Sequence, residues 1–158
     1  MALLRGLLVF VVLTTTAAAA GPMSYAGIGL GTTLSAAKAR FPNSKVVGDY
    51  IYVADRDRRD QVSGIQLAGT VKPPMVRLSF ERPRDAAGRG QPQFPKCKVI
   101  EAELRGRYGA PDEIRKSAAA APPRADRIWQ GARETLTLVC FAGPSGELLA
   151  EAVVIAAR

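Results

Sequence analysis

Alternation of apolar and polar residues predicts several β-strands in this chain. The segment 75–82 (MVRLSFER) has apolar residues at every second position, as expected for an antiparallel strand with one buried face. Similar patterns predict further strands at 46–54, 62–71, 127–132, 134–142 and 147–157. The sequence GPSG at 143–146 predicts a hairpin turn between the last two strands.

Two other segments have apolar residues at steps of three and four, which predicts amphipathic helices. The first covers 34–41, with threonines before it as candidate caps and Pro42 as its end. The second covers 96–108, where Gly109 stands at the usual place of a helix C-cap. Its apolar side consists of Cys97, Ile100, Leu104 and Tyr108.

The predicted elements follow the order of one helix and three strands, and this order occurs twice. Segment 83–95 contains three Pro and two Gly without periodicity, so we interpret it as a linker between a first unit at 21–82 and a second at 96–158. The passage 117–126 (SAAAAPPRAD) reads as irregular. The predicted fold class is α+β, an antiparallel sheet with short helices on one face, arranged as a tandem αβββ-αβββ pseudo-repeat.

The first twenty residues have the pattern of an export signal. Arg5 supplies positive charge, 7–13 (LLVFVVL) forms an apolar run, and small residues precede Gly21 as a cleavage site. A membrane anchor is the alternative, but the run is shorter than the roughly 20 residues that span a bilayer. We therefore expect residues 1–20 to be a signal peptide and the mature chain to be soluble, without a transmembrane anchor, in the periplasm or outside the cell.

The composition adds a strong positive charge. The 158 residues include 22 Lys and Arg against 14 Asp and Glu, a formal charge of +8 that falls to about +7 once the predicted signal is removed. Such a balance favours acidic partners, namely lipid head groups, lipopolysaccharide or acidic proteins. Nucleic acid is a weaker candidate as a partner, because export removes the protein from most of it. Acidic residues are interspersed among the basic ones, which is also typical of an ordinary solvated surface.

The two cysteines, Cys97 and Cys140, are predicted to form a disulfide. Cys97 lies on the apolar side of its helix, and Cys140 shares a strand face with two leucines, so both point towards one core. An exported protein meets an oxidising compartment, where such a pair can be bonded. Two separate buried thiols are the alternative. With two Cys and no His, the sequence does not predict a zinc site or any other metal or cofactor.

The sequence does not predict an enzyme. The absence of His excludes the Ser-His and Cys-His arrangements. Ser35 and Lys38 have the S-x-x-K spacing, but the further elements of enzymes that use it are absent. The adjacent carboxylates Asp112 and Glu113 point to opposite sides of an extended chain, so we interpret them as solvated turn residues.

Three sequence features resemble those of a known group of bacterial envelope proteins. These are the entry GIGLGTTLSAAKARFP at 27–42, the helix end YGAP at 108–111, and the Trp-containing strand RIWQG at 127–131. Together they resemble small proteins of the outer-membrane small-protein-A type and of the β-lactamase-inhibitory-protein-like fold. The resemblance implies short helices on an antiparallel sheet and a non-enzymatic role, either binding another envelope protein or supporting outer-membrane assembly. Assembly-type members are typically lipoproteins, whereas this chain has no Cys after its apolar run.

Aromatic and arginine side chains are the candidates for recognition, because they dominate many protein interfaces. The candidate residues are Tyr50, Tyr52, Arg56, Arg58, Arg59, Phe94 and Trp129. For the tyrosine pair, packing in the core is favoured over exposure. The function expected is that of an exported, soluble, non-enzymatic binding or accessory module of the cell envelope. The alternative is capture of an acidic polymer or lipid head group by the Arg-rich loops 55–60 and 82–98.

Overall fold

The structure is a computed structural model that describes residues 21–54, 57, 61–69, 72, 74–81 and 93–158. The predicted signal peptide at 1–20 and most of the predicted linker at 83–95 lie outside these residues. So do Arg56, Arg58 and Arg59, together with most of the loops proposed to capture an acidic polymer.

The described residues form two helices and ten strands. The helices are α1 (Leu34–Arg40) and α2 (Cys97–Tyr108). The strands are β1 (Ser24–Tyr25), β2 (Ile28–Gly29), β3 (Lys45–Val47), β4 (Tyr50–Tyr52), β5 (Gly64–Ala68), β6 (Met75–Ser79), β7 (Glu113–Ser117), β8 (Arg124–Gln130), β9 (Glu134–Ala142) and β10 (Leu148–Ala157).

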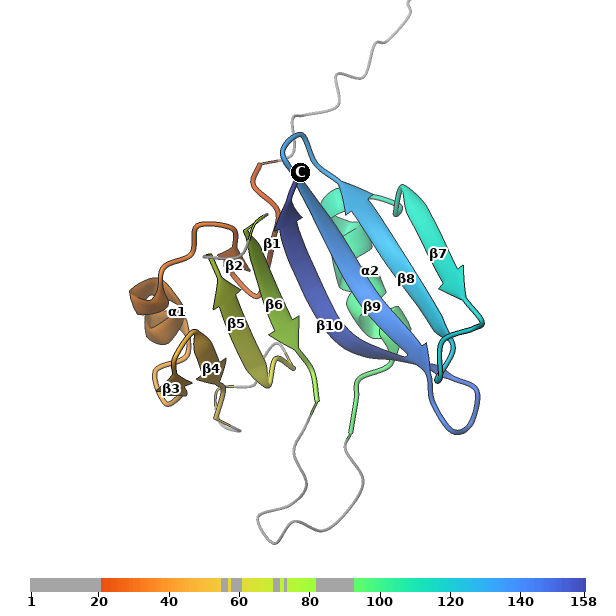
Figure 1. Cartoon of the computed structure of the whole chain (residues 1–158), viewed down its shortest axis with the longest axis horizontal. Coiled ribbons are helices and arrows are strands. Elements are labelled where there is room, and N and C mark those ends of the chain that lie inside the picture. The colour runs from red at the N-terminus through yellow and green to blue at the C-terminus, as the bar shows by residue number, and fades with distance from the viewer. Residues whose placement is uncertain (1–20, 55–56, 58–60, 70–71, 73, 82–92) are drawn as a thin grey trace, which may run out of the picture.

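Eight strands form one antiparallel sheet in the order β3-β4-β5-β6-β10-β9-β8-β7, as Figure 1 shows. Strands β1 and β2 form a separate small hairpin. In the large sheet, each half of the chain contributes four neighbouring strands, and the halves meet where β6 pairs with β10. The predicted α+β class with a mainly antiparallel sheet is confirmed.

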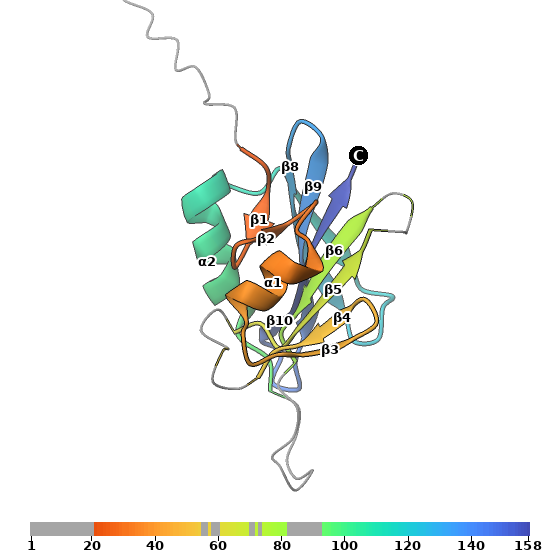
Figure 2. The same cartoon turned by 90° about the vertical axis from the view of Figure 1, so that its left-hand side faces the viewer.

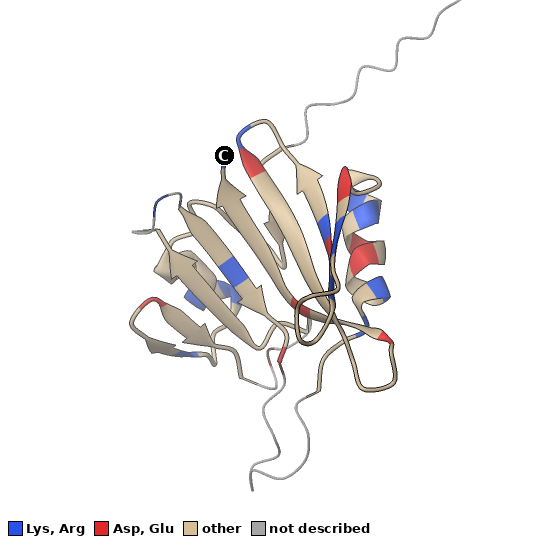
Figure 3. Cartoon of the chain, turned by 45° about the vertical axis from the view of Figure 1, so that its right-hand side comes forward, with Lys and Arg blue, Asp and Glu red and all other residues tan. Residues whose placement is uncertain are grey.

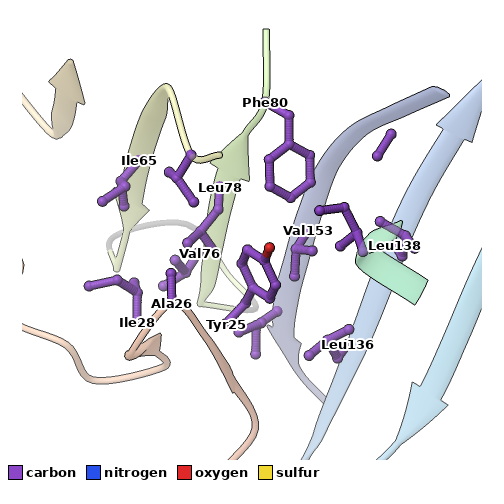
Figure 4. Close-up of a cluster of buried hydrophobic side chains, with 14 of the residues drawn as sticks. Tyr25, Ala26, Ile28, Ile65, Val76, Leu78, Phe80, Leu136, Leu138 and Val153 are labelled. Carbon is purple, nitrogen blue, oxygen red and sulfur yellow. The ribbon is translucent and has the colours of Figure 1, made fainter. Parts of the chain in front are cut away.

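Both helices and the β1–β2 hairpin lie on the same side of the sheet (Figure 2). The sheet positions that face them are apolar, and they form one core with residues from both halves. Figure 4 shows Tyr25 of β1 among side chains of the sheet, where its ring meets that of Phe80 edge-on at 5.6 Å. The same core contains Phe41 at the end of α1 and Leu104 of α2. The two predicted units therefore share a single hydrophobic core.

The predicted three strands per half are wrong, because each half contributes four strands to the large sheet and the first half also contains the β1–β2 hairpin. The predicted strand at 46–54 contains two strands, β3 and β4, joined by a tight turn at Gly48, whose positive φ of 60° suits glycine. The sequence predicts no strand at β7, because Glu113 is expected in a turn and Ser117 at the beginning of an irregular passage. Its sequence EIRKS is mostly exposed and has a single apolar residue, so no alternating pattern indicates it.

The helix boundaries follow local signals. Thr33 caps α1, since its Oγ1 accepts a hydrogen bond from the Ala36 N–H at 3.1 Å. Gly109 ends α2 with a positive φ of 80°, as its position in the sequence predicted. Thr33 therefore fixes the beginning of α1, and Gly109 directs the chain from α2 into the strands that follow it.

Candidate binding surface

The sheet has a second face, opposite the helices, which we call the open face. Residues directly opposite each other in neighbouring strands point to the same side, so the register identifies the side chains on this face. One row crosses all eight strands and consists of Val47, Tyr50, Gln66, Arg77, Val154, Thr137, Ile128 and Glu113. No helix or strand of the described part of the chain covers this face (Figure 2).

The structure places Tyr50 and Tyr52 on the open face. Ile51 is buried in the core, and Tyr52 is 54% exposed, so the expectation of core packing is wrong for this residue. The two tyrosine rings lie 4.6 Å apart between centroids and are tilted by 55°. Val47, 53% exposed and directly opposite Tyr50 in β3, extends this patch. The result is an exposed aromatic and aliphatic surface at one end of the sheet.

Gly64 holds the tyrosine pair in position. The Tyr50 ring crosses from β4 over Gly64 in β5, and a Cβ atom at Gly64 would lie 1.9 Å from the Tyr50 Oη. Gly64 is therefore buried without a side chain of its own, and the ring takes the place that a side chain would occupy. Any larger residue at this position would displace the ring.

A pocket of about 430 Å³ opens in the central part of the same face. Its apolar wall includes Phe94 and Phe141, whose rings meet edge-on with centroids 4.9 Å apart, and Pro122. Phe94 belongs to the predicted linker, yet the adjoining Pro95 carbonyl accepts a hydrogen bond from the Ala150 N–H of β10. Chain segments distant in sequence thus meet here, and for this reason the sequence did not reveal the pocket.

The polar wall of the pocket is a cluster of charged side chains. Arg77 of β6 donates to the carboxylate of Glu151 on β10, and Arg124 of β8 lies 3.8 Å from the other oxygen of that carboxylate. Arg124 is also 3.8 Å from Asp126, and its buried Nε has no hydrogen-bond partner among the described residues. The sequence does indicate where Arg77 lies, because the alternation of apolar and polar residues in β6 places its side chain on the face opposite the core.

Trp129 is not part of any surface. It is 1% exposed, and its Nε1 donates to the Gly109 carbonyl at 3.0 Å. Its proposal as a binding residue is therefore wrong, because the side chain fills the core between β8 and the end of α2. This hydrogen bond satisfies the single polar group of the indole, so the side chain can be buried.

The predicted disulfide between Cys97 and Cys140 is present. The two sulfur atoms are bonded at 2.02 Å, and the Cα atoms are 6.0 Å apart. The bond ties the first residue of α2 to the middle of β9, and both cysteines are buried. It lies on the helix side of the sheet, away from the open face.

A second charged cluster lies on the helix side and is structural. Glu101 of α2 accepts hydrogen bonds from Arg105 at 2.8 Å and from Arg127 of β8 at 2.8 Å. Burial disfavours the charged form of Glu101, but the hydrogen bonds from Arg105 and Arg127 outweigh it, so the pKa of Glu101 lies below its ordinary value. The cluster joins the helix to the sheet.

The other candidate residues have local roles. Asp112 accepts a hydrogen bond from the Gln130 N–H at 2.7 Å, and Glu113 pairs with Arg115 at 3.0 Å, so neither is simply solvated. Lys38 donates to the Ser44 carbonyl and thereby ties α1 to the turn that follows it. In the described residues, no group of three His, Cys, Asp or Glu side chains is placed to hold a metal ion.

The described part of the chain contains no helix that is long and apolar enough to cross a membrane. Comparison of the chain with protein-family models, with curated proteins and with solved structures found no match.

Proposed function

We propose that this protein is an exported, non-enzymatic binding module of the cell envelope, and that it contacts a partner protein through the open face of its sheet. The observation that carries the proposal is the pair of Tyr50, which is half-buried, and Tyr52, which is exposed, on a face that no described helix or strand covers. Large apolar groups on such a face are typical of interaction sites in soluble proteins.

The chemistry of the open face suits a protein partner. Tyrosine and arginine are enriched among the residues that dominate binding energy, and the face carries both, with Arg77 in the same cross-strand row as Tyr50. The neighbouring pocket offers two aromatic rings and room for one side chain of the partner. Most positions of the central strands carry no charge (Figure 3), and the charged side chains at the pocket, Arg77, Arg124 and Glu151, offer polar contacts to a partner.

Export and envelope location rest on three observations. The sequence of residues 1–20 has the organisation of a signal peptide. The Cys97–Cys140 disulfide suits an oxidising compartment. The resemblance to small envelope proteins, carried by the segments 27–42, 108–111 and 127–131, implies the same location.

We also infer that the two halves are copies of one unit. Each half contains a helix followed by four antiparallel strands of the large sheet, and the last strands of the two halves, β6 and β10, pair with each other. The β1–β2 hairpin before α1 has no counterpart in the described part of the second half. Joining two such units side by side doubles the width of the sheet, which explains how a chain of this length presents a face eight strands wide.

Site-directed photo-crosslinking tests the proposed function. A photoreactive phenylalanine analogue is placed at Tyr52 on the open face, and in a separate variant at Val99 on α2, which is 48% exposed and serves as a matched control on the helix side. In cells of the source, the probe at position 52 should crosslink to a defined envelope protein, and the probe at position 99 should not. Equal crosslinking at both positions, or none at position 52, would overturn the proposal.

Salt dependence separates this proposal from capture of an acidic polymer. Binding through an apolar centre should change little between about 50 and 500 mM salt, whereas capture by basic loops should weaken steeply because exposed charges are screened. A Tyr52→Ala variant adds a second criterion. It should abolish partner binding and leave any adsorption to anionic vesicles or lipopolysaccharide unchanged.

A further inference from the structure

Strand β7 forms one edge of the large sheet and pairs on one side with β8. In Figure 1 it lies at the right-hand border of the sheet, with α2 behind the neighbouring strands. An edge strand presents backbone N–H and C=O groups that can pair with another strand. Ile114, in this strand, is 49% exposed. Within the described part of the chain, the outer side of β7 is therefore without a partner strand, and it has an apolar residue in it.

The charges around Ile114 have a symmetrical order. The sequence from 112 to 116 is Asp-Glu-Ile-Arg-Lys, with two acids before the isoleucine and two bases after it. Figure 3 shows charged positions of both signs at this edge and on the adjoining helix. Charged residues on an edge strand oppose aggregation whatever their order. Avoidance of aggregation therefore does not explain why two acids precede Ile114 and two bases follow it. A sequence with this order complements itself when it is read in the opposite direction.

Antiparallel pairing of β7 with the β7 strand of a second copy, centred on Ile114, would place opposite charges together. Ile114 would face Ile114, Glu113 would face Arg115, and the flanking Asp112 would face Lys116. In this register each residue is opposite one of the same parity, so the sheet continues from one copy to the next with matching faces. Glu113 and Arg115 already form an ion pair at 3.0 Å within one strand, and pairing would combine two such pairs into a four-membered cluster.

The other edge of the sheet lacks these properties. Strand β3 has three residues, Lys45 to Val47, and its one charged residue is basic. Two copies of β3 paired antiparallel about their central residue would bring Val47 of one copy opposite Lys45 of the other, with no opposite charge to meet it. Pairing of β3 with itself is therefore not favoured, and the two edges differ in what they can bind.

We propose that β7 is a self-association site, through which two copies of this chain form a symmetric dimer by antiparallel strand pairing. The two-fold axis is perpendicular to the sheet, so the open faces of both copies lie on the same side and form one continuous surface. A five-residue strand pair is a small interface, and we expect a dissociation constant of roughly 10–100 μM.

Analytical ultracentrifugation of the purified protein between about 5 and 500 μM tests this proposal. The wild-type protein should pass from monomer to dimer in this range. Both Glu113→Arg and Arg115→Glu place like charges opposite each other in the dimer, so each should weaken self-association by roughly tenfold or more. Lys45→Glu on the β3 edge changes the net charge by the same two units as Arg115→Glu and should leave the dissociation constant unchanged.

Mixing the two single variants gives the sharper result. A Glu113→Arg chain carries two bases and an Arg115→Glu chain carries two acids at these positions, so each homodimer is repelled while the mixed pair is complementary. An equimolar mixture should therefore form heterodimers at concentrations where each variant alone is monomeric. Circular dichroism and the absence of free thiol in each variant control for folding.

Three outcomes would overturn the proposal: a wild-type protein that stays monomeric at about 500 μM, a dimer that both charge reversals leave intact, or a mixture that does not recombine. The dimer does not depend on the proposed function, because β7 and the tyrosine pair lie at opposite ends of the sheet. A failure of crosslinking at Tyr52 and a failure of self-association are therefore separate results.

Discussion

Removal of the Cys97–Cys140 disulfide should lower the stability of this protein severely. The appropriate perturbation replaces both cysteines by alanine, because a single substitution would leave a reactive thiol. Serine is less suitable, since both positions are buried and a hydroxyl there would need a hydrogen-bond partner. In the structure the bond joins the start of α2 to β9 and so encloses α2, β7 and β8.

The size of the effect follows from the length of the closed loop. The cysteines are 43 residues apart in sequence. On the chain-entropy estimate, closing a loop of about 44 residues stabilises the folded state by about 4 kcal/mol. Domains of this size are stable by roughly 5–15 kcal/mol in total, so the bond contributes a large share. Loss of the two buried sulfur atoms adds a smaller packing cost.

Equilibrium unfolding in urea measures this contribution. Trp129 is the one tryptophan of the chain and is buried, so its fluorescence should shift to the red on unfolding. The oxidised wild type, the reduced wild type and the double alanine variant are compared under identical conditions. Both forms without the bond should be about 4 kcal/mol less stable than the oxidised wild type, and the alanine variant should be the less stable of the two because it also lacks the buried sulfur atoms.

The dependence of the unfolding free energy on urea provides an internal control. An unfolded chain without the crosslink exposes more surface, so the m-value should rise when the bond is removed. A loss of less than about 1 kcal/mol, with an unchanged m-value, would refute the reasoning from loop closure.

Three further substitutions test the structure at separate points. Gly64→Ala should displace the Tyr50 ring and abolish partner binding, with a stability change below about 1 kcal/mol in urea unfolding, since the ring is the mobile end of a surface side chain. Trp129→Phe removes a buried hydrogen bond and ring volume, and should cost about 2–3 kcal/mol without a specific effect on binding. Because this variant has no tryptophan, its unfolding in urea is followed by circular dichroism and compared with the wild type measured in the same way. The pKa of Glu101 is lowered in the folded state, so its charge stabilises the fold fully above the unfolded pKa, and this stabilisation is lost as the pH falls through the folded pKa. Glu101→Gln should therefore destabilise at pH 7 and much less at pH 3, and an equal loss at both values would contradict the charge-based account.

Much of the fold could be predicted from local patterns, because the core positions repeat with the period of each element. The strand predicted at 134–142 has the observed bounds of β9, and the helix predicted at 96–108 differs from α2 by one residue. The pairing of Cys97 with Cys140 was also predicted correctly, since both lie on the apolar side of their elements. These features depend on burial, which leaves a clear pattern in the sequence.

The features that were missed are those that burial does not control. Strand β7 is held by pairing with β8 and has almost no buried side chain, so its polar sequence resembled a loop. Exposure of the tyrosine pair is decided by which face of β4 meets the helices, and the alternation in β4 fits either face. Trp129 is the opposite case, a predicted surface residue that is buried. Its indole N–H donates to the carbonyl of Gly109, twenty positions earlier, and the sequence pattern around Trp129 does not indicate this partner.

The junction between β6 and β10 also determines how this protein must assemble. Its paired residues are 73 to 81 positions apart in sequence, from Ser79 with Ala152 to Met75 with Ala156, whereas the other strand pairs of the sheet join much nearer segments. Distant contacts carry the largest entropic cost of loop closure and slow the folding of a chain. We therefore expect each half of the sheet to form early and the central pair to form last, in the rate-limiting step. The continuous eight-stranded face, which neither half possesses, comes into existence only at that step.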